Sequence, residues 1–147
     1  MEAKMKTIQE SIDIAAAPEK VWEILLDFAA YSDWNPFITS IAGTPREGER
    51  LKVRIKPPGG MAMTFAPRVL EAEAPRILRW LGKLGISGVF DGEHKFQIEN
   101  AGNGTTRFTQ SEAFAGLLVP LMAGTLSKTA EGFRQMNAAL KQRSESS

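Results

Sequence analysis

Hydrophobic and polar residues alternate over several short segments of the chain, a pattern typical of β-strands with one buried face. The clearest example is "FDGEHKFQI" at 90–98, where the even-numbered residues are apolar or glycine apart from His94 and the odd-numbered ones are charged or amide. Alternation also occurs at 7–14, 51–56, 61–65, 77–84 and 106–114. The turn-forming stretches "PPGG" at 57–60 and "NAGNG" at 100–104 separate some of these segments. The middle of the chain therefore predicts about six antiparallel strands.

Two other segments have helical spacing. Pro18 suits the first turn of a helix, and apolar residues follow at helical intervals up to Phe28. Pro36 disfavours helix at Asn35, so this region should end before it. A second, longer helix is predicted from about Pro120 to Lys141, because one apolar face recurs at steps of three and four: Met122, Leu126, Thr129, Phe133, Met136 and Leu140. At ~1.5 Å per residue this helix would be about 30 Å long.

The order of these elements predicts an α+β fold: one strand, short helices, a run of antiparallel strands and a long terminal helix. A curved antiparallel sheet with one buried face must cover that face, and the terminal helix has the length to do so. With 147 residues, the chain is expected to form one domain over 1–143. The tail at 144–147 is expected to be disordered.

Composition narrows the classes of partner. Hydrophobic residues make up 43% of the chain and charged residues 24%, and the formal net charge is +1. The basic residues are spread along the sequence, which argues against nucleic acid. The N-terminus lacks the apolar core of a signal peptide, and the longest apolar stretch, at 115–124, is about half of the roughly 20 residues that a membrane span needs. We therefore expect a cytoplasmic protein without an integral membrane segment, and leave its oligomeric state open.

Residue types that hold metals and nucleotides are scarce. The chain has no cysteine and one histidine, which removes thiolate zinc sites, disulfides and cysteine nucleophiles. The acidic residues are scattered rather than clustered, so no metal is expected. The glycines at 82, 85, 88 and 92 match neither the phosphate-loop nor the dinucleotide pattern and are interpreted as loop flexibility and close backbone approach. We expect no cofactor.

The single histidine shares a strand face with apolar residues, and three interpretations of His94 stay open. It could be a core histidine whose ring nitrogens bond to a carbonyl or carboxylate, since buried polar groups are normally hydrogen-bonded. It could contact a ligand, because pockets place a few polar groups among many apolar ones. It could also be a general acid or base.

Glu112 is the natural partner of His94. It has the parity of Phe108 and Phe114, on the strand expected to pair with the His94 strand across the turn at 100–104. An inward carboxylate needs a compensating group such as His94, an arginine or a ligand. Alternatively, Glu112 turns to solvent at a strand end. Gln110, on the same face, could add a neutral hydrogen bond.

Three motifs and the order of elements resemble a known superfamily. The motifs are "WNPFI" at 34–38, "GEHKFQI" at 92–98 and "GTTRFTQSEAFAG" at 104–116. They are similar to the SRPBCC superfamily (START/Bet v 1-like), and within it to the polyketide cyclase/dehydrase and lipid-transport-like branch. The resemblance implies a helix-grip fold, in which a curved seven-stranded antiparallel sheet wraps around the C-terminal helix and leaves a cavity. The loops at 57–60 and 82–88 would border its mouth.

This resemblance implies an apolar interior and three possible functions. The candidate ligand-binding residues are Trp34, Met63, Phe65, Trp80, Phe96, Phe108, Gln110, Met122 and Phe133. The leading hypothesis is binding, and possible transport, of a small hydrophobic molecule such as a lipid, isoprenoid or polyketide, with His94, Glu112 or Gln110 orienting its polar end. The alternative is a cofactor-independent cyclase, dehydratase or isomerase in which His94 moves protons with help from Glu112. A third is a protein-interaction domain of the chaperone-activator type.

Overall fold

The computed structural model describes residues 5–83, 88 and 90–146, in an α+β arrangement. The strands in the described part are β1 (Met5–Ile14), β2 (Ile38–Ala42), β3 (Lys52–Ile55), β4 (Met63–Phe65), β5 (Arg68–Glu73), β6 (Ile77–Lys83), β7 (Asp91–Gly102) and β8 (Thr105–Ala115). The helices are α1 (Pro18–Leu26), α2 (Tyr31–Trp34) and α3 (Ala123–Glu145), with short 3₁₀ helices η1 (Phe28–Ala30) and η2 (Val119–Leu121).

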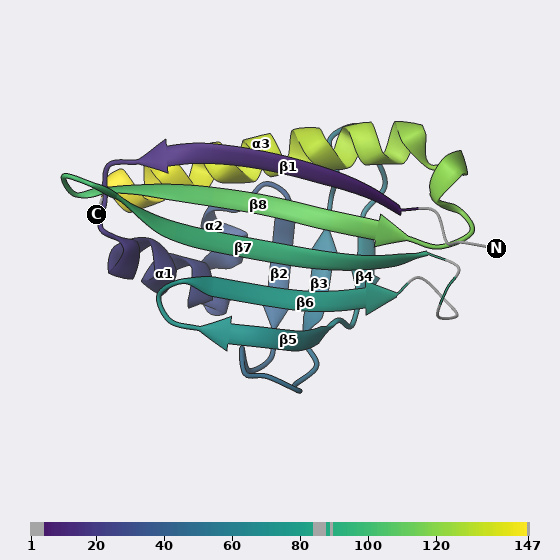
Figure 1. Ribbon diagram of the computed structural model, residues 1–147, viewed down its shortest axis with the longest axis horizontal. Coiled ribbons are helices and arrows are strands. Elements are labelled where there is room, and N and C mark those ends of the chain that lie inside the picture. Colours follow the sequence, from purple (N-terminus) through teal and green to yellow (C-terminus); the bar gives the residue numbers. More distant parts are fainter. Residues whose placement is uncertain (1–4, 84–87, 89, 147) are drawn as a thin grey trace.

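The strands form two antiparallel sheets, which together with α3 make up a helix-grip arrangement. The larger sheet has the order β1-β8-β7-β6-β5 and the smaller one the order β2-β3-β4. Figure 1 shows α3 running beside β1, the small sheet crossing behind the large one, and α1 and α2 at the end where β7 turns into β8. The helix-grip prediction is confirmed. No helix within the described ranges combines the length and apolar character that a bilayer crossing requires.

The seven predicted strands become eight described ones because Pro67 interrupts one of them. β4 ends at Phe65 and β5 begins at Arg68, and a proline has no N–H for a strand ladder. The carbonyl of Pro67 accepts a hydrogen bond from Leu51 N at 2.9 Å, and Val69 N donates to Glu49 O at 2.8 Å. These main-chain bonds pair residues 49–51, which lead into β3, with residues 67–69 at the start of β5, so the interrupted strand bends from the small sheet into the large one.

Local chemistry sets the turns that bring the elements together. α2 ends at Trp34, and Asn35 is extended ahead of Pro36, with φ −89° and ψ 113°. The Asn35 side-chain oxygen accepts hydrogen bonds from the next two main-chain N–H groups, those of Phe37 (2.9 Å) and Ile38 (2.8 Å), and so turns the chain into β2. Asn103 and Gly104 connect β7 to β8 with φ of 54° and 73°, the left-handed values of a type I′ hairpin turn.

The terminal helix is displaced from its predicted bounds. It begins at Ala123, since η2 occupies 119–121, and it ends at Glu145 rather than Lys141. Ser144 is buried, and the Glu145 carboxylate accepts hydrogen bonds from Ala15 N (2.8 Å) and Lys141 Nζ (2.6 Å). Residues 144 and 145, expected in a disordered tail, are thus the last turn of a helix that is tied to the end of β1.

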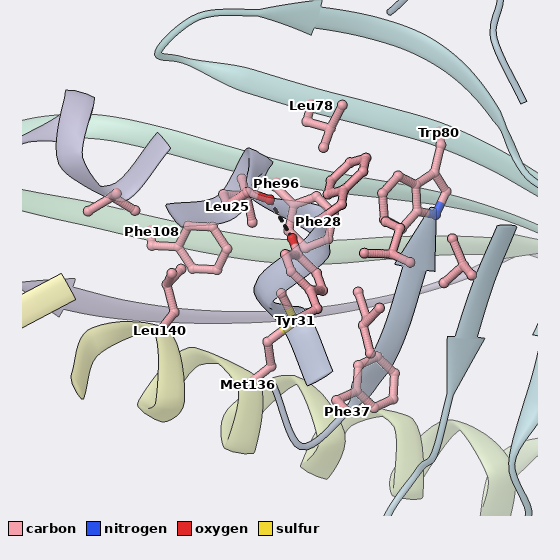
Figure 2. Close-up of a cluster of buried hydrophobic side chains, with 14 of the residues drawn as sticks. Leu25, Phe28, Tyr31, Phe37, Leu78, Trp80, Phe96, Phe108, Met136 and Leu140 are labelled. Atoms are coloured by element: carbon pink, nitrogen blue, oxygen red, sulfur yellow. Dashed lines mark hydrogen bonds between the residues drawn. The ribbon is translucent and has the colours of Figure 1, made fainter. Parts of the chain in front are cut away.

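Large side chains fill the end of the grip where α1 and α2 lie (Figure 2). They come from the helical region, the large sheet and α3, and include Leu25, Phe28, Tyr31, Phe96, Phe108, Met136 and Leu140. The Tyr31 hydroxyl donates to the Leu25 carbonyl at 2.6 Å, and burial raises the pKa of this phenol far above its usual value. The candidate cavity lies toward the other end of the large sheet.

Candidate functional site

A cavity of about 210 Å³ lies between the large sheet, the small sheet and the first turns of α3. Its wall includes residues of the large sheet, such as Trp80 of β6 and Phe114 of β8, and Thr125 and Thr129 of α3. Met63 of β4 lines the cavity and is 41% exposed, so the cavity reaches the surface there. Apolar side chains dominate the wall.

Six of the residues singled out in the sequence line this cavity: His94, Glu112, Met63, Phe65, Trp80 and Met122. The sequence placed the mouth at the loops 57–60 and 82–88. Of those loops, Gly82 and Lys83 are in the wall, but both belong to β6. Residues 84–87 of the second loop lie outside the described residues.

Five expected ligand-binding residues lie away from the cavity wall: Trp34, Phe96, Phe108, Gln110 and Phe133. Trp34 packs against the ring of Tyr31, with centroids 5.2 Å apart, instead of closing the cavity. The other four are fully buried in the filled part of the interior. The physical reason is that alternation predicts which face of a strand a residue takes, whereas the position along the strand decides whether that face meets packed side chains or space.

Other wall residues were missed, and two of them carried a readable signal. Phe37, Ile38, Ile55 and Phe114 line the cavity without having been singled out. Gly82 and Gly92 are paired strand residues rather than loop residues, and both line the cavity. Their parity matches that of Trp80 and His94, and a glycine on the inward face of a strand marks a place where something approaches the backbone closely. A Cβ at position 82 would press on the Phe65 ring, and one at 92 on the Glu112 carboxylate.

His94 lies at the inner wall of the cavity with both ring nitrogens engaged. Nδ1 is 2.9 Å from Glu112 Oε1, and Nε2 is 2.9 Å from Gln110 Oε1. The side chain is only 5% exposed, against 17% for Glu112. The strand register explains the contact with Glu112, because His94 of β7 is directly opposite Glu112 of β8. The rings of Trp80, Phe96 and Phe133 surround the imidazole, with centroids 4.4 to 5.3 Å away.

A buried hydrogen-bond chain continues behind His94. Gln110 Nε2 donates to Asn137 Oδ1 at 3.0 Å, and Asn137 Nδ2 donates to the main-chain carbonyl of Glu10 at 3.1 Å. Asn137 is on α3, so the chain ties the helix to β8 and β1. Asn137 was not among the residues expected at the site, although its spacing of four from Phe133 places it on the apolar face of the helix.

The contact between His94 and Glu112 can hold a proton on either atom, which is the chemistry of a general acid/base pair or of an anchor for a polar group. In the described residues, no group of three or more histidine, aspartate or glutamate side chains could hold a metal ion. The site therefore combines the His94–Glu112 pair with a mostly apolar wall that also includes Thr64, Lys83, Thr125 and Thr129.

Comparison with known proteins assigns the family. The family of polyketide cyclases/dehydrases and lipid-transport proteins matches residues 5–145. The chain belongs to this family. No curated protein matches the sequence significantly.

Solved structures of diverse proteins share this fold. A START superfamily protein from Mycobacterium smegmatis is 22% identical, with a TM-score of 0.72 over 95% of this chain and 97% of that one. The Zhui aromatase/cyclase from Streptomyces sp. R1128 is 15% identical, with a TM-score of 0.76 over 97% and 94%. A norcoclaurine synthase from Thalictrum flavum is 14% identical, with a TM-score of 0.67 over 98% and 96%. At these identities the similarity shows the fold, and the function must be argued from the site.

Proposed function

We propose that this protein binds a small, mostly apolar molecule in the cavity between the sheets and α3. The observation that carries the proposal is the wall itself, in which the polar pair of His94 and Glu112 lies among aromatic and methionine side chains. Burial of apolar ligand surface would supply affinity, at roughly 25 cal/mol per Å², and the polar pair would orient one end. The family, which includes lipid-transport proteins and cyclases, supports the same class of ligand.

The size of the cavity limits the ligand. A cavity of about 150 Å³ in another protein holds benzene. The cavity here, about 210 Å³, therefore suits two fused rings or an aliphatic group of similar bulk. Methionines such as Met63 and Met122 can adapt to ligands of irregular shape.

Filling the cavity tests this proposal. Thr125→Phe places a ring in the cavity wall, whereas Ser127→Phe adds the same ring to an exposed position two residues further along α3. We expect the wild type and Ser127→Phe to bind 2-methylnaphthalene in a ligand-observed NMR titration, and Thr125→Phe to lose this binding. Native mass spectrometry of gently purified protein should show any natural ligand in the same two proteins. Equal binding by all three would contradict the proposal.

An enzymatic role is the second candidate, and the short contact between His94 Nδ1 and Glu112 Oε1 favours it. The pair would take a proton from the carbon beside a carbonyl group and return one to the resulting enolate, without a cofactor. The test is deuterium exchange at C2 of 1-tetralone in D₂O, followed by NMR. Wild type and Lys95→Gln, a change on the opposite face of β7, should accelerate exchange, and His94→Gln should not. Equal exchange with wild type and His94→Gln would remove this candidate.

A further inference from the structure

The buried hydrogen-bond chain behind the cavity has one direction. The main-chain carbonyl of Glu10 can only accept, so Asn137 turns its amide nitrogen to that carbonyl and its amide oxygen to Gln110. Gln110 consequently donates through Nε2 to Asn137 and presents Oε1 to His94. Because an amide oxygen cannot donate, Nε2 of His94 must carry a hydrogen.

Because Nε2 of His94 carries a hydrogen, a single further proton occupies the contact between His94 Nδ1 and Glu112 Oε1. Either Nδ1 carries the proton and Glu112 is a carboxylate, or Oε1 carries it and the imidazole is neutral. In both arrangements the other carboxyl oxygen, Oε2, has no hydrogen and can only accept. Both nitrogens of His94 are already bonded, so the imidazole has no free polar atom for a ligand.

The second oxygen of Glu112 lies where a ligand could reach it. Within the described residues, the side-chain hydrogen bond of Glu112 uses Oε1, which leaves Oε2 for another donor. Oε2 lies over the backbone of Gly92, in space that a Cβ at that position would occupy. Gly92 and Glu112 both line the cavity. The missing side chain at position 92 thus makes room for the carboxyl group and for whatever bonds to it.

We propose that the cavity selects a mostly apolar ligand that ends in a neutral hydroxyl group, which donates a hydrogen bond to Glu112 Oε2 above Gly92. The inference rests on the proposed ligand binding and names the polar end of that ligand. A ligand that ends in a carboxylate has no hydrogen to donate and would bring its negative charge to an acceptor. Glu112 is then the residue that touches the ligand, while His94, Gln110 and Asn137 are positioning residues that keep Oε2 an acceptor.

Three probes of one shape test the choice of polar group: 2-naphthol, 2-methylnaphthalene and 2-naphthoate. Titrations of the full chain near neutral pH, followed by ligand-observed NMR, give their dissociation constants. A hydrogen bond to an ionised or proton-sharing acceptor should make 2-naphthol bind roughly tenfold more tightly than 2-methylnaphthalene. The anion 2-naphthoate should bind most weakly of the three.

Variants at two positions then locate the acceptor. Glu112→Leu removes it and should bring the two neutral probes to within about twofold of each other. Glu112→Gln should keep the preference, since its amide nitrogen can donate to Nδ1 and its amide oxygen can replace Oε2. Gly92→Ala displaces Oε2 and should lose the preference while still binding 2-methylnaphthalene. Gly124→Ala, whose added methyl would meet no atom within 4 Å, is the matched control and should behave as wild type.

The outcomes separate this inference from the proposed function. If wild type binds 2-naphthol and 2-methylnaphthalene equally, or prefers 2-naphthoate, the hydroxyl inference is overturned and ligand binding stands. If it binds none of the three, both are overturned. Should Glu112→Leu fail to fold, Gly92→Ala decides, and an unchanged preference for 2-naphthol in that variant would overturn the role of Oε2.

Discussion

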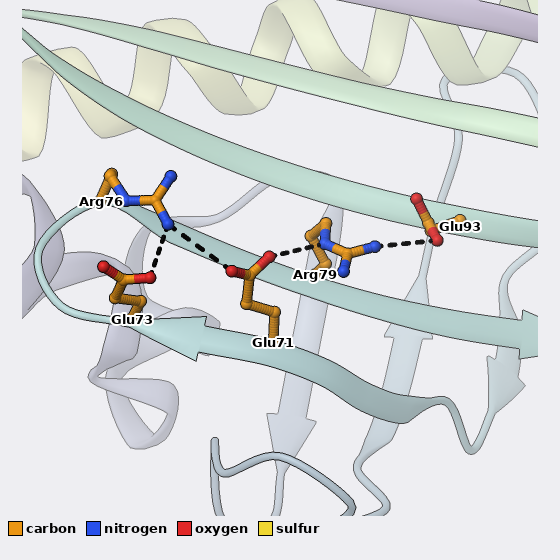
Figure 3. Close-up of polar contacts among 5 residues, drawn as sticks. All are labelled: Glu71, Glu73, Arg76, Arg79 and Glu93. Atoms are coloured by element: carbon orange, nitrogen blue, oxygen red, sulfur yellow. Dashed lines mark hydrogen bonds and ion pairs between the residues drawn. The ribbon is translucent and has the colours of Figure 1, made fainter.

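The two faces of β7 carry polar networks of very different exposure. On the concave face, His94 is 5% exposed and belongs to the chain of hydrogen bonds that leads from Glu112 to the Glu10 carbonyl. On the convex face, Glu93 ends a ladder of ion pairs in which Arg79 bonds to Glu71 and to Glu93, while Arg76 bonds to Glu71 and Glu73 (Figure 3). Side chains of this ladder are 28 to 60% exposed.

The comparison shows that burial, more than the number of bonds, decides what a polar network does. Exposed ion pairs contribute roughly 0–1 kcal/mol each, because water solvates and screens the separated charges almost as well. A buried donor or acceptor that loses its partner costs about 1–3 kcal/mol. Residues of the ion-pair ladder can therefore be substituted without harm to the fold. The buried hydrogen-bond chain on the concave face, in contrast, constrains both the position of α3 and the protonation of His94 Nε2.

The largest contrast in unfolding free energy is expected between substitutions at two adjacent residues of β6. Trp80 is buried on the concave face and Arg79 belongs to the convex ladder. Trp80→Ala should lower the free energy of unfolding by about 3–5 kcal/mol, through lost burial and the void left behind. Arg79→Ala should lower it by about 1 kcal/mol or less. Urea unfolding of both variants measures the difference, and similar losses would break the comparison.

A smaller loss of unfolding free energy is expected when the buried hydrogen-bond chain on the concave face is interrupted. Gln110→Leu leaves His94 Nε2 and Asn137 Oδ1 without their partner, which should cost about 1–3 kcal/mol of unfolding free energy for each group. Asn137→Leu should cost a similar amount. Since the two residues belong to one chain, the double variant should lose less than the sum of the single losses. Additive losses in this double-mutant cycle would show that the two bonds act independently.

Salt should distinguish the two networks further. A cycle of Arg79→Met and Glu93→Gln should give a coupling energy of about 0.2–1 kcal/mol at low salt. The coupling should shrink in 1 M salt, where the Debye length is about 3 Å. The coupling between Gln110 and Asn137 should stay unchanged, because both side chains are neutral and buried. A salt-sensitive Gln110–Asn137 coupling would contradict this distinction.

The smallest effect is expected on the stability of the fold at acid pH. The hydrogen bond from Arg76 to Glu73 holds the pKa of that carboxyl below its ordinary value of 4.5. A carboxyl whose folded pKa is lowered stabilises the fold fully above the ordinary pKa, and this contribution is lost as pH falls through the lower, folded value. Wild type should therefore lose stability more steeply below about pH 4.5 than Glu73→Gln.

Unfolding curves at a series of pH values measure this difference. In a plot of stability against pH, Arg76→Gln should make the decline on the acid side (the acid limb) less steep, as Glu73→Gln does. An acid limb equally steep in wild type and both variants would show that the pair contributes nothing to stability.

The faces of the strands could be predicted because alternation is a local property. The pattern at 90–98 and 106–114 placed His94 and Gln110 inward, and both are buried; Glu112 on the same parity faces the cavity. The type I′ turn at Asn103 and Gly104 follows from the backbone freedom of these residues. The same pattern could not show that Phe96 and Phe108 meet packed side chains while Phe114 meets space.

The sequence by itself determined the family, through motifs distributed along residues 5–145. It also determined the element order and the inward parity of the polar residues, because these depend on neighbours two to four positions apart. Only the tertiary structure decided where the cavity lies, which wall residues surround it and how Asn137 of α3 reaches Gln110 of β8. These features depend on the volumes and hydrogen-bond partners that distant segments bring together. The absence of a side chain at Gly92, beside the carboxyl group of Glu112, acquires its meaning only from that assembly.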